Sequence, residues 1–266
     1  MSLIRLAIEK AKSAGVGWVA ANNSNHYGIA GWYSLQAAQA GLIGLSFTNT
    51  SPLQTPTRAK AAALGTNPLT VAAPAKNGET FFLDMATTAV ALGKIEIQNR
   101  KNEPLPEGWA IDKSGKVTTD GRVAMQEGCL LPLGGTEINS GYKGYGLAFM
   151  VELFCGILSG SDYGPKIRRW LEADRPANLG QCFIAVDPNC FAPGFSDRLQ
   201  DMMDFCRNME PTESSKPVLV AGDPEKMHMD KVNRQGGITY LQNQIDASAA
   251  LAEKLGVDAM KSVIRS

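Results

Sequence analysis

The first fifty residues alternate twice between two patterns of apolar residues, and this alternation limits the folds open to the chain. Residues 2–13 carry leucine, isoleucine and alanine at helical spacing up to Gly15, and the short apolar run VGWVAAN follows as a strand. A second helix is expected over residues 31–40, and the run LIGLSFTN after it reads as a strand buried on both faces. Helices and buried strands in turn predict an α/β fold.

The later part of the chain is expected to continue in a similar way. Strands are predicted at GTNPLTVAAPA and TFFLDMA, on either side of the turn KNGE, and a helix is predicted across residues 87–91. Residues 102–135 are dense in proline and glycine and are expected to form irregular surface. The remaining predictions are a helix over 144–160, a strand at CFIAVDP, a helix over 195–209 and, after Gly222, an amphipathic helix with Leu251, Leu255 and Val257 on one side.

Composition and charge narrow the class of ligand. With 266 residues, 44% of them apolar, the chain can bury a large core. Twenty-six basic residues balance 26 acidic ones, so no long-range field favours nucleic acid or an anionic membrane, and a small molecule or another protein is the expected partner. The five cysteines form no CxxC pair and only two histidines are present, which predicts reduced thiols, a cytoplasmic location and no metal site. The longest apolar stretch, residues 146–158, is interrupted by Glu152 and is too short to span a bilayer.

Two glycine-rich stretches suggest a nucleotide site to different degrees. The stretch GVGWVA at residues 15–20 lies between a helix and a strand, the reverse of the dinucleotide fingerprint, and this context excludes a Rossmann fold. The stretch GYKGYG at residues 141–146 precedes a helix, so its amides and Lys143 could meet a phosphate, although a flexible turn is an equal reading.

Asp84 and His26 are the two candidate side chains for chemistry at strand ends. Asp84 is either an N-cap of the helix that follows or a ligand contact at the end of a buried strand. His26 lies in NNSNHYGIAG, residues 22–31, where imidazole can exchange a proton with a hydroxyl near neutral pH; the alternative is a loop histidine bonded to backbone. His228 lies in a charged stretch without a pattern and is not expected to take part.

Several motifs, in order, resemble the non-Rossmann malate/L-lactate dehydrogenase family, which includes sulfolactate and ureidoglycolate dehydrogenases. The resemblance covers nearly the whole chain. It rests on NNSNHYGIAG, LGTNPLTVAAP, FLDMATTAVALGKI, LPEGWAIDKSGKVTTD, LPLGG, GYKGYGLAFMVELFCGILSG, GDPEK and RQGGI.

The resemblance implies a fold, a cofactor and site residues. The implied fold is a three-layer α/β/α arrangement with a mixed, non-Rossmann sheet and a smaller helical part formed by the chain ends. The implied reaction is hydride transfer between NAD or NADP and a small 2-hydroxy acid such as malate or lactate, in a homodimer. His26 is the implied acid/base, and the implied cofactor contacts are Thr50, Asp84, Met85, Ala86, Lys143 and Gly144. Asn67 and Pro68 match the GTNP turn of the family and are expected beside the site.

The same resemblance implies three parts of the chain. Residues 1–39 are expected to be the remnant of a substrate and dimerisation domain that carries His26, and residues 40–213 to be the cofactor-binding α/β domain. Residues 214–266 are expected to form a helical segment that packs on the first part.

Two departures from the family pattern leave other functions open. Nothing in the sequence matches the SHGxxR-like segment that precedes the histidine strand in the family, so the arginine clamp for the substrate carboxylate is expected to be missing. Gln181 stands where the family often has histidine, which predicts an altered contact. A truncated, catalytically silent protein that binds cofactor or dimerises is therefore the second hypothesis, and reduction of a cyclic imine carboxylate is the third.

Overall fold

The computed structural model of the chain describes residues 3–126, 128–172 and 174–261. These residues fall into two compact units, Met1–Gly222 and Asp223–Ser266, and each unit is described by itself. The three-part division expected from the family resemblance stays a prediction.

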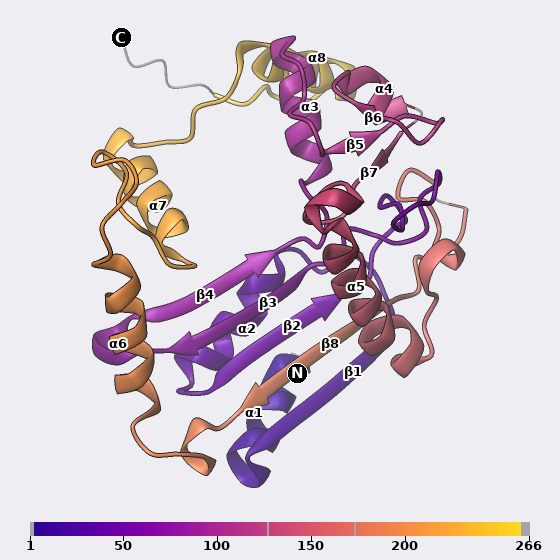
Figure 1. The fold of residues 1–266 in the computed structure, drawn as a ribbon. Coiled ribbons are helices and arrows are strands. Elements are labelled where there is room, and N and C mark those ends of the chain that lie inside the picture. The colour runs from indigo at the N-terminus through magenta and orange to yellow at the C-terminus, as the bar shows by residue number, and fades with distance from the viewer. Residues whose placement is uncertain (1–2, 127, 173, 262–266) are drawn as a thin grey trace. The chain divides into compact units, whose positions relative to one another are not determined.

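The first unit is built on a five-stranded sheet in which the spatial order of the strands differs from their order along the chain (Figure 1). Its strands are β1 (Val16–Ser24), β2 (Ile43–Thr48), β3 (Leu69–Pro74), β4 (Thr80–Met85) and β8 (Leu179–Val186), in the order β1-β8-β2-β3-β4. Every neighbouring pair is antiparallel. The α/β class and the absence of a Rossmann arrangement are confirmed, whereas the expected mixed sheet is corrected to an antiparallel one.

The position of β8 explains this difference. Strands β1 and β2 run in the same direction, and α2 (Ala30–Gln39) makes the crossing between them, as the alternation of the first fifty residues suggests. They are not neighbours, because β8 lies between them and runs opposite to both. Residues 179–185 of β8 are all buried, so this strand is suited to the interior of the sheet and not to an edge.

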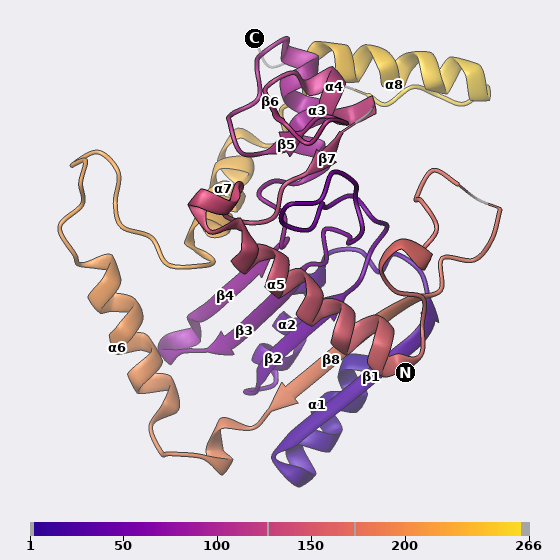
Figure 2. The same ribbon diagram turned by 45° about the vertical axis from the view of Figure 1, so that its right-hand side comes forward.

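Helices cover both faces of the sheet, and the side chains of β8 show which helix faces which side. Phe183 and Ala185 share a core with α1 (Leu3–Ala14) and with Ala37 of α2. Cys182 and Ile184, which alternate with them, share a core with Val151 of α5 (Gly141–Glu152). Figure 2 shows α5 lying across its face of the sheet. The expected three layers are therefore present, and α1 belongs to one of them.

Helix α5 begins earlier than the sequence predicts and changes its winding near its end. It starts at Gly141, three residues before the expected Gly144, and continues into a π-helical turn, η3 (Leu153–Ile157). The stretch GYKGYG thus forms the start of the helix and not a flexible loop. Single π-helical turns within α-helices occur frequently at functional sites.

A second small core corrects the prediction for residues 102–135. Residues 102–135 are not irregular surface, because β5 (Ala110–Ile111), β6 (Val117–Thr118) and β7 (Cys129–Leu130) form a small antiparallel sheet in the order β6-β5-β7. With α3 (Leu92–Lys101) and α4 (Gly121–Gln126), this sheet encloses buried apolar side chains that include Ile95, Leu105 and Leu130.

The helix predicted across residues 87–91 is also wrong, since α3 begins at Leu92. The preceding segment does not form a helix because its backbone bonds to remote parts of the chain. The Thr87 N–H donates to the Thr66 carbonyl at 2.9 Å, and the Ala89 N–H donates to the Leu131 carbonyl at 2.9 Å.

Short helices and one longer helix complete the first unit. They are η1 (Lys76–Gly78), η2 (Glu137–Asn139), η4 (Gly164–Lys166), η5 (Pro188–Cys190) and α6 (Phe195–Arg207). The second unit consists of α7 (Asp223–Gln235) and α8 (Gln242–Leu255). Among the described residues, no helix combines the length and hydropathy needed to cross a membrane.

Candidate active site

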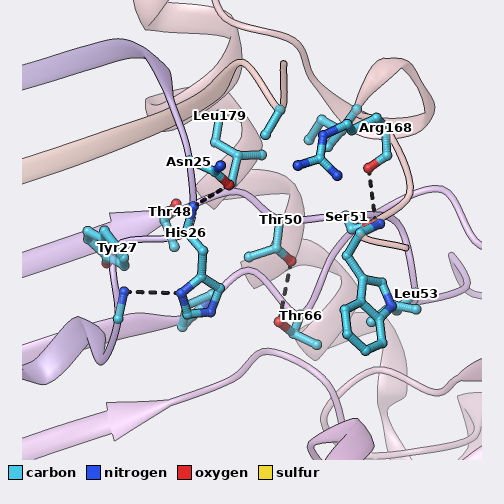
Figure 3. A pocket seen from close by; sticks show the side chains of 15 residues that line it. Asn25, His26, Tyr27, Thr48, Thr50, Ser51, Leu53, Thr66, Arg168 and Leu179 are labelled. Carbon is cyan, nitrogen blue, oxygen red and sulfur yellow. Dashed lines mark hydrogen bonds between the residues drawn. The ribbon is translucent and has the colours of Figure 1, made fainter. Parts of the chain in front are cut away.

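A cavity of about 410 Å³ opens at the end of β1 (Figure 3). Two of the predicted site residues, His26 and Thr50, line this cavity. None of the described residues that line it is acidic, and Arg168 contributes a permanent positive charge. The lining side chains come from four parts of the chain, within residues 25–28, 48–53, 66–68 and 167–179.

The loop that carries His26 is held by a buried side chain of β8. The Gln181 amide accepts a hydrogen bond from Ser24 Oγ at 3.0 Å, and its Nε2 donates to the Asn25 carbonyl at 2.7 Å. The Asn25 side chain in turn accepts from the His26 N–H at 2.8 Å. Gln181 therefore uses both ends of its amide to fix the two residues that precede the histidine.

The imidazole of His26 has one nitrogen fixed by the backbone. The Gly28 N–H donates to Nδ1 at 3.1 Å, so Nδ1 is an acceptor and the neutral ring carries its proton on Nε2. Gly28 has a φ of 87°, which favours glycine at this turn. The backbone bond expected by the alternative interpretation of His26 is thus present at Nδ1, and Nε2 has no hydrogen bond with a described residue.

Tyr27 anchors the same loop from its buried side. Its hydroxyl lies 3.0 Å from Ser46 Oγ, and its ring stacks on Tyr33 with centroids 4.6 Å apart. The Tyr33 hydroxyl donates to the Tyr27 carbonyl at 2.7 Å. Burial raises the pKa of Tyr27 well above its ordinary value, so the phenol stays protonated and has a structural role.

Thr50 is positioned by the turn that follows residue 64. Its N–H donates to Asn67 Oδ1 at 3.0 Å, and Asn67 Nδ2 donates to Glu152 Oε1 at 2.9 Å. Asn67 is fully buried and has a φ of 35°, a left-handed conformation that asparagine tolerates better than most residues. The GTNP turn therefore holds Thr50 in the cavity wall, and Pro68 lines the cavity beside it.

Glu152 is a buried carboxyl at the junction of α5 and η3. Besides the bond from Asn67, its Oε2 accepts from Asn49 Nδ2 at 3.1 Å and from the Gly164 N–H at 3.3 Å. Burial raises the pKa of Glu152, and the hydrogen bonds from Asn67 and Asn49 oppose that rise. The carboxyl thus ties the ends of β2 and of the GTNP turn to the chain near Gly164. The only signal for it in the sequence is an acidic residue inside an apolar run.

Asp84 caps a helix, but not the helix that follows it in the chain. Its Oδ2 accepts a hydrogen bond at 2.9 Å from the N–H of Gly31, in the first turn of α2. Met85 packs against the core beneath α5. The described lining of the cavity does not include Asp84, Met85 or Ala86.

Lys143 and Gly144 lie in the first turn of α5, and they also lie outside the described lining of the cavity. A Cβ at Gly144 would stand 2.4 Å from the backbone nitrogen of Leu133, so close packing of α5 requires glycine there. The N–H groups of Gly141 and Lys143 already donate to the carbonyls of Thr136 and Ser140, at 2.9 Å each. The exposed ammonium of Lys143, more than the helix amides, is therefore the group suited to bind an anion.

One wall of the cavity comes from a segment that sequence reasoning missed. Ser51 Oγ donates to the Arg168 carbonyl at 3.1 Å and accepts from the Trp170 N–H at 2.9 Å. Both Arg168 and Trp170 line the cavity. Their partner lies more than one hundred residues earlier in the chain, and no local pattern links the two segments.

Comparisons with known proteins identify the chain's relatives. The sequence profile of malate/L-lactate dehydrogenases matches residues 1–247. The chain belongs to the malate/L-lactate dehydrogenase family. It is 40% identical over 261 residues to the malate dehydrogenase of Pyrococcus abyssi, an alignment that covers 97% of this chain and 71% of that protein.

Solved structures agree with this assignment to the malate/L-lactate dehydrogenase family. The sulfolactate dehydrogenase of Methanocaldococcus jannaschii superposes with a TM-score of 0.81 at 38% identity, over 97% of this chain and 72% of that chain. The malate dehydrogenase of Entamoeba histolytica superposes with a TM-score of 0.86 at 31% identity, over 96% of this chain and 73% of that chain. The predicted family and the predicted enzyme class, an oxidoreductase of hydroxy acids, are therefore confirmed.

The names of two more distant members of the family specify a cofactor. Ureidoglycolate dehydrogenase (NAD(+)) of Escherichia coli K12 is 33% identical over 235 residues, which cover 86% of this chain and 64% of that protein. The (2R)-3-sulfolactate dehydrogenase (NADP(+)) of Chromohalobacter salexigens is 33% identical over 208 residues, which cover 78% of this chain and 60% of that protein. The prediction that the cofactor is NAD or NADP, with the choice between the two left open, is confirmed.

Proposed function

We propose that the chain transfers a hydride between NAD(H) or NADP(H) and a small 2-hydroxy acid of the malate or lactate type, with His26 as the acid/base. The supporting observation is that His26 shares a cavity with Arg168 and with no described acidic side chain. Such a cavity suits a substrate that carries a carboxylate and a carbonyl or hydroxyl group.

The bond to Gly28 defines how His26 exchanges a proton. In the resting ring Nε2 already carries a proton, so a second proton can enter only at Nδ1, and the Gly28 N–H must then be released. The doubly protonated ring donates from Nε2 to the carbonyl oxygen as the substrate is reduced. This donation leaves the remaining proton on Nδ1 and a free lone pair on Nε2. In the opposite direction the Nδ1–H form of the ring takes the proton of the substrate hydroxyl at Nε2, because imidazole can act both as acid and as base near neutral pH.

The charges of the residues present suit a nicotinamide dinucleotide, whose phosphate groups are negative. When bound, this cofactor supplies or accepts the hydride. We propose that Lys143 binds its phosphate groups, since this lysine is exposed in the first turn of α5, where the helix dipole also favours negative charge. Thr50 would contact the cofactor from the cavity wall, and Asp84, Met85 and Ala86 from the end of β4.

We also propose that the chain forms a homodimer in the cytoplasm. The edge strand β1 exposes Val16 and Trp18, and exposed apolar side chains on a sheet edge favour an interface. The five cysteines are free thiols, in keeping with a reducing compartment. Light scattering after gel filtration tests the dimer, and a monomer at micromolar concentration would contradict it.

The first experiment is a fluorescence titration of the chain with NADH and NADPH, followed by oxaloacetate and pyruvate in the same cuvette. Binding with turnover supports the proposal and identifies the cofactor. Binding without turnover supports the silent homologue instead. Absence of binding to both cofactors contradicts the proposal and the cofactor-binding form of the silent homologue.

A further inference from the structure

The guanidinium of Arg168 has an unusual position for a permanently charged group. It lines the same cavity as His26, and its Nε is buried without a hydrogen-bond partner among the described residues. Figure 3 shows the Arg168 side chain on the side of the cavity opposite His26. A buried donor without an acceptor is unfavourable, so a ligand that supplies an acceptor here gains free energy on binding.

The remaining hydrogen bonds of Arg168 hold the guanidinium through Nη1 and leave its Nε without a partner among the described residues. Its Nη1 donates to the carbonyls of Arg169 and Glu172. The backbone of the same segment is tied to Ser51 at the Arg168 carbonyl and at the Trp170 N–H. Ile167, next to it, is buried in a small core with Ala177 and Leu179. The guanidinium is thus positioned in advance, and its Nε and Nη2 form the edge that can meet two oxygens at once.

The charge and shape of this edge select the kind of group that it can bind. A planar carboxylate accepts two parallel hydrogen bonds from a guanidinium edge, which gives orientation as well as affinity. None of the described residues that line the cavity supplies a competing carboxylate. A neutral carbonyl offers a single oxygen to the two donors and would leave the charge uncompensated.

We propose that Arg168 binds the carboxylate that adjoins the reacting carbon of the 2-hydroxy acid. This inference rests on the proposed function and adds the residue that recognises the substrate. With the carboxylate on Arg168 and the neighbouring oxygen toward His26, the substrate is oriented by two groups 142 residues apart in the chain.

The test compares Arg168→Met and Arg168→Lys with the control Arg169→Met, which removes an exposed arginine next in the chain and outside the described lining of the cavity. For Arg168→Met we expect KM for both pyruvate and oxaloacetate to rise roughly 10- to 100-fold, the size of a charge-assisted hydrogen bond, with the NADH or NADPH Kd unchanged. Arg168→Lys keeps the charge but loses the two-pronged geometry, so its KM is expected to lie between those of the parent chain and Arg168→Met. The control is expected to match the parent chain.

Three results would overturn the inference. An unchanged KM in both Arg168 variants would show that this residue does not bind substrate. A weakened cofactor Kd with unchanged KM would assign the guanidinium to the cofactor. A higher KM for oxaloacetate alone would assign it to the second carboxylate, because pyruvate has only one.

A binding measurement separates this inference from the proposed function. Oxamate, a non-reducible analogue of pyruvate, is titrated into each protein with saturating cofactor, and tryptophan fluorescence reports binding because Trp170 lines the cavity. If the parent chain binds oxamate without turning over substrate, and Arg168→Met loses that binding, the carboxylate site stands and the proposed catalysis fails. Equal oxamate binding by the parent chain and both variants would reject the site. Should Arg168→Met fail to fold, as judged by thermal melting, the Arg168→Lys result decides.

Discussion

The carboxylate of Asp84, on the edge strand β4, caps helix α2 by accepting a hydrogen bond at 2.9 Å from the N–H of Gly31, 53 residues earlier in the chain. The N-cap position itself, Ile29, has no side chain that could do this. A side chain remote in the sequence therefore replaces the usual local cap, and the strand end and helix start are fixed to each other.

This relationship predicts different effects for two substitutions of Asp84. Asp84→Ala should lower the free energy of unfolding by about 1 kcal/mol, the usual cost of losing an N-cap, whereas Asp84→Asn keeps an acceptor and should lose less. Urea denaturation measures both. If Asp84 also contacts the cofactor, Asp84→Asn should weaken NADH or NADPH binding while leaving stability nearly unchanged; equal cofactor affinity would limit Asp84 to capping.

Gly31 should be intolerant of any side chain. A Cβ there would lie 2.3 Å from Phe82 Cζ and 2.5 Å from Asp84 Oδ2, so Gly31→Ala must move these two side chains, and with them the Asp84 cap, or displace α2. We expect a loss of about 1–3 kcal/mol, typical of overpacking, measured by urea denaturation. Gly28→Ala is not an equivalent control because Gly28 has a positive φ, but Gly93→Ala, with open space around its Cβ, should have little effect.

Loss of the imidazole should remove activity without removing cofactor binding. For His26→Ala we expect kcat to fall about 10²- to 10⁴-fold, the contribution of a positioned acid/base. The matched control is His228→Ala, which changes the second histidine of the chain, on α7. Equal activity of His26→Ala and the parent chain would exclude the acid/base role.

The tautomer of His26 can be measured directly. Because Nδ1 accepts from the Gly28 N–H, the neutral ring should carry its proton on Nε2. Nitrogen-15 chemical shifts from long-range proton–nitrogen correlation spectra distinguish the two tautomers. A dominant Nδ1–H form would mean that the Gly28 bond is absent in solution, and the proton route described above would have to change.

Gln181 should support catalysis without touching the substrate. Gln181→Leu leaves the Ser24 hydroxyl and the Asn25 carbonyl without their buried partner, so we expect about 1–3 kcal/mol less stability and a lower kcat. Gln181→His can restore one donor and one acceptor and should recover part of the activity. Parent-like kcat and stability in Gln181→Leu would show that the histidine loop holds its shape without this amide.

Glu152 should make stability depend on pH in a defined direction. Burial raises its pKa in the folded chain, so the folded state binds this proton more tightly than the unfolded state. The contribution of Glu152 is therefore fully present below the ordinary pKa of 4.5 and declines as pH rises through the higher folded value. A pKa difference of one corresponds to about 1.4 kcal/mol.

The measurement is the free energy of unfolding of the parent chain minus that of Glu152→Gln, from pH 4 to pH 8. Groups common to both proteins cancel in this difference, and it should decrease as pH rises. A difference that increases with pH would mean that the hydrogen bonds from Asn49 and Asn67 outweigh burial.

Local patterns predicted the helices and strands of the first 85 residues because each pattern depends on neighbours in the chain. The segment around Thr87 was harder, since its backbone bonds to Thr66 and to the strand near Leu131 outweigh its local preference. Residues 102–135 looked like surface because their strands are two residues long and leave almost no periodic signal.

The cavity could be predicted only in part. His26 and Thr50 were found through motifs, but Arg168 lies in a charged segment that resembles solvated surface, and its relation to Ser51 exists only in three dimensions. The pairing of Asp84 with Gly31 was hidden for the same reason: a carboxylate at a strand end suggests a cap, but the sequence does not say of which helix.

The insertion of β8 between β1 and β2 has a consequence for the chain as it is synthesised. Strand β2 is complete at Thr48, yet its neighbour β8 begins only at Leu179. At roughly 5–20 residues per second, the ribosome needs on the order of ten seconds to bridge this interval. Until then β1 and one edge of β2 remain open to wrong strand partners. Gln181 belongs to the same late strand, so the loop of His26 is among the last parts of the nascent sheet to acquire its final shape.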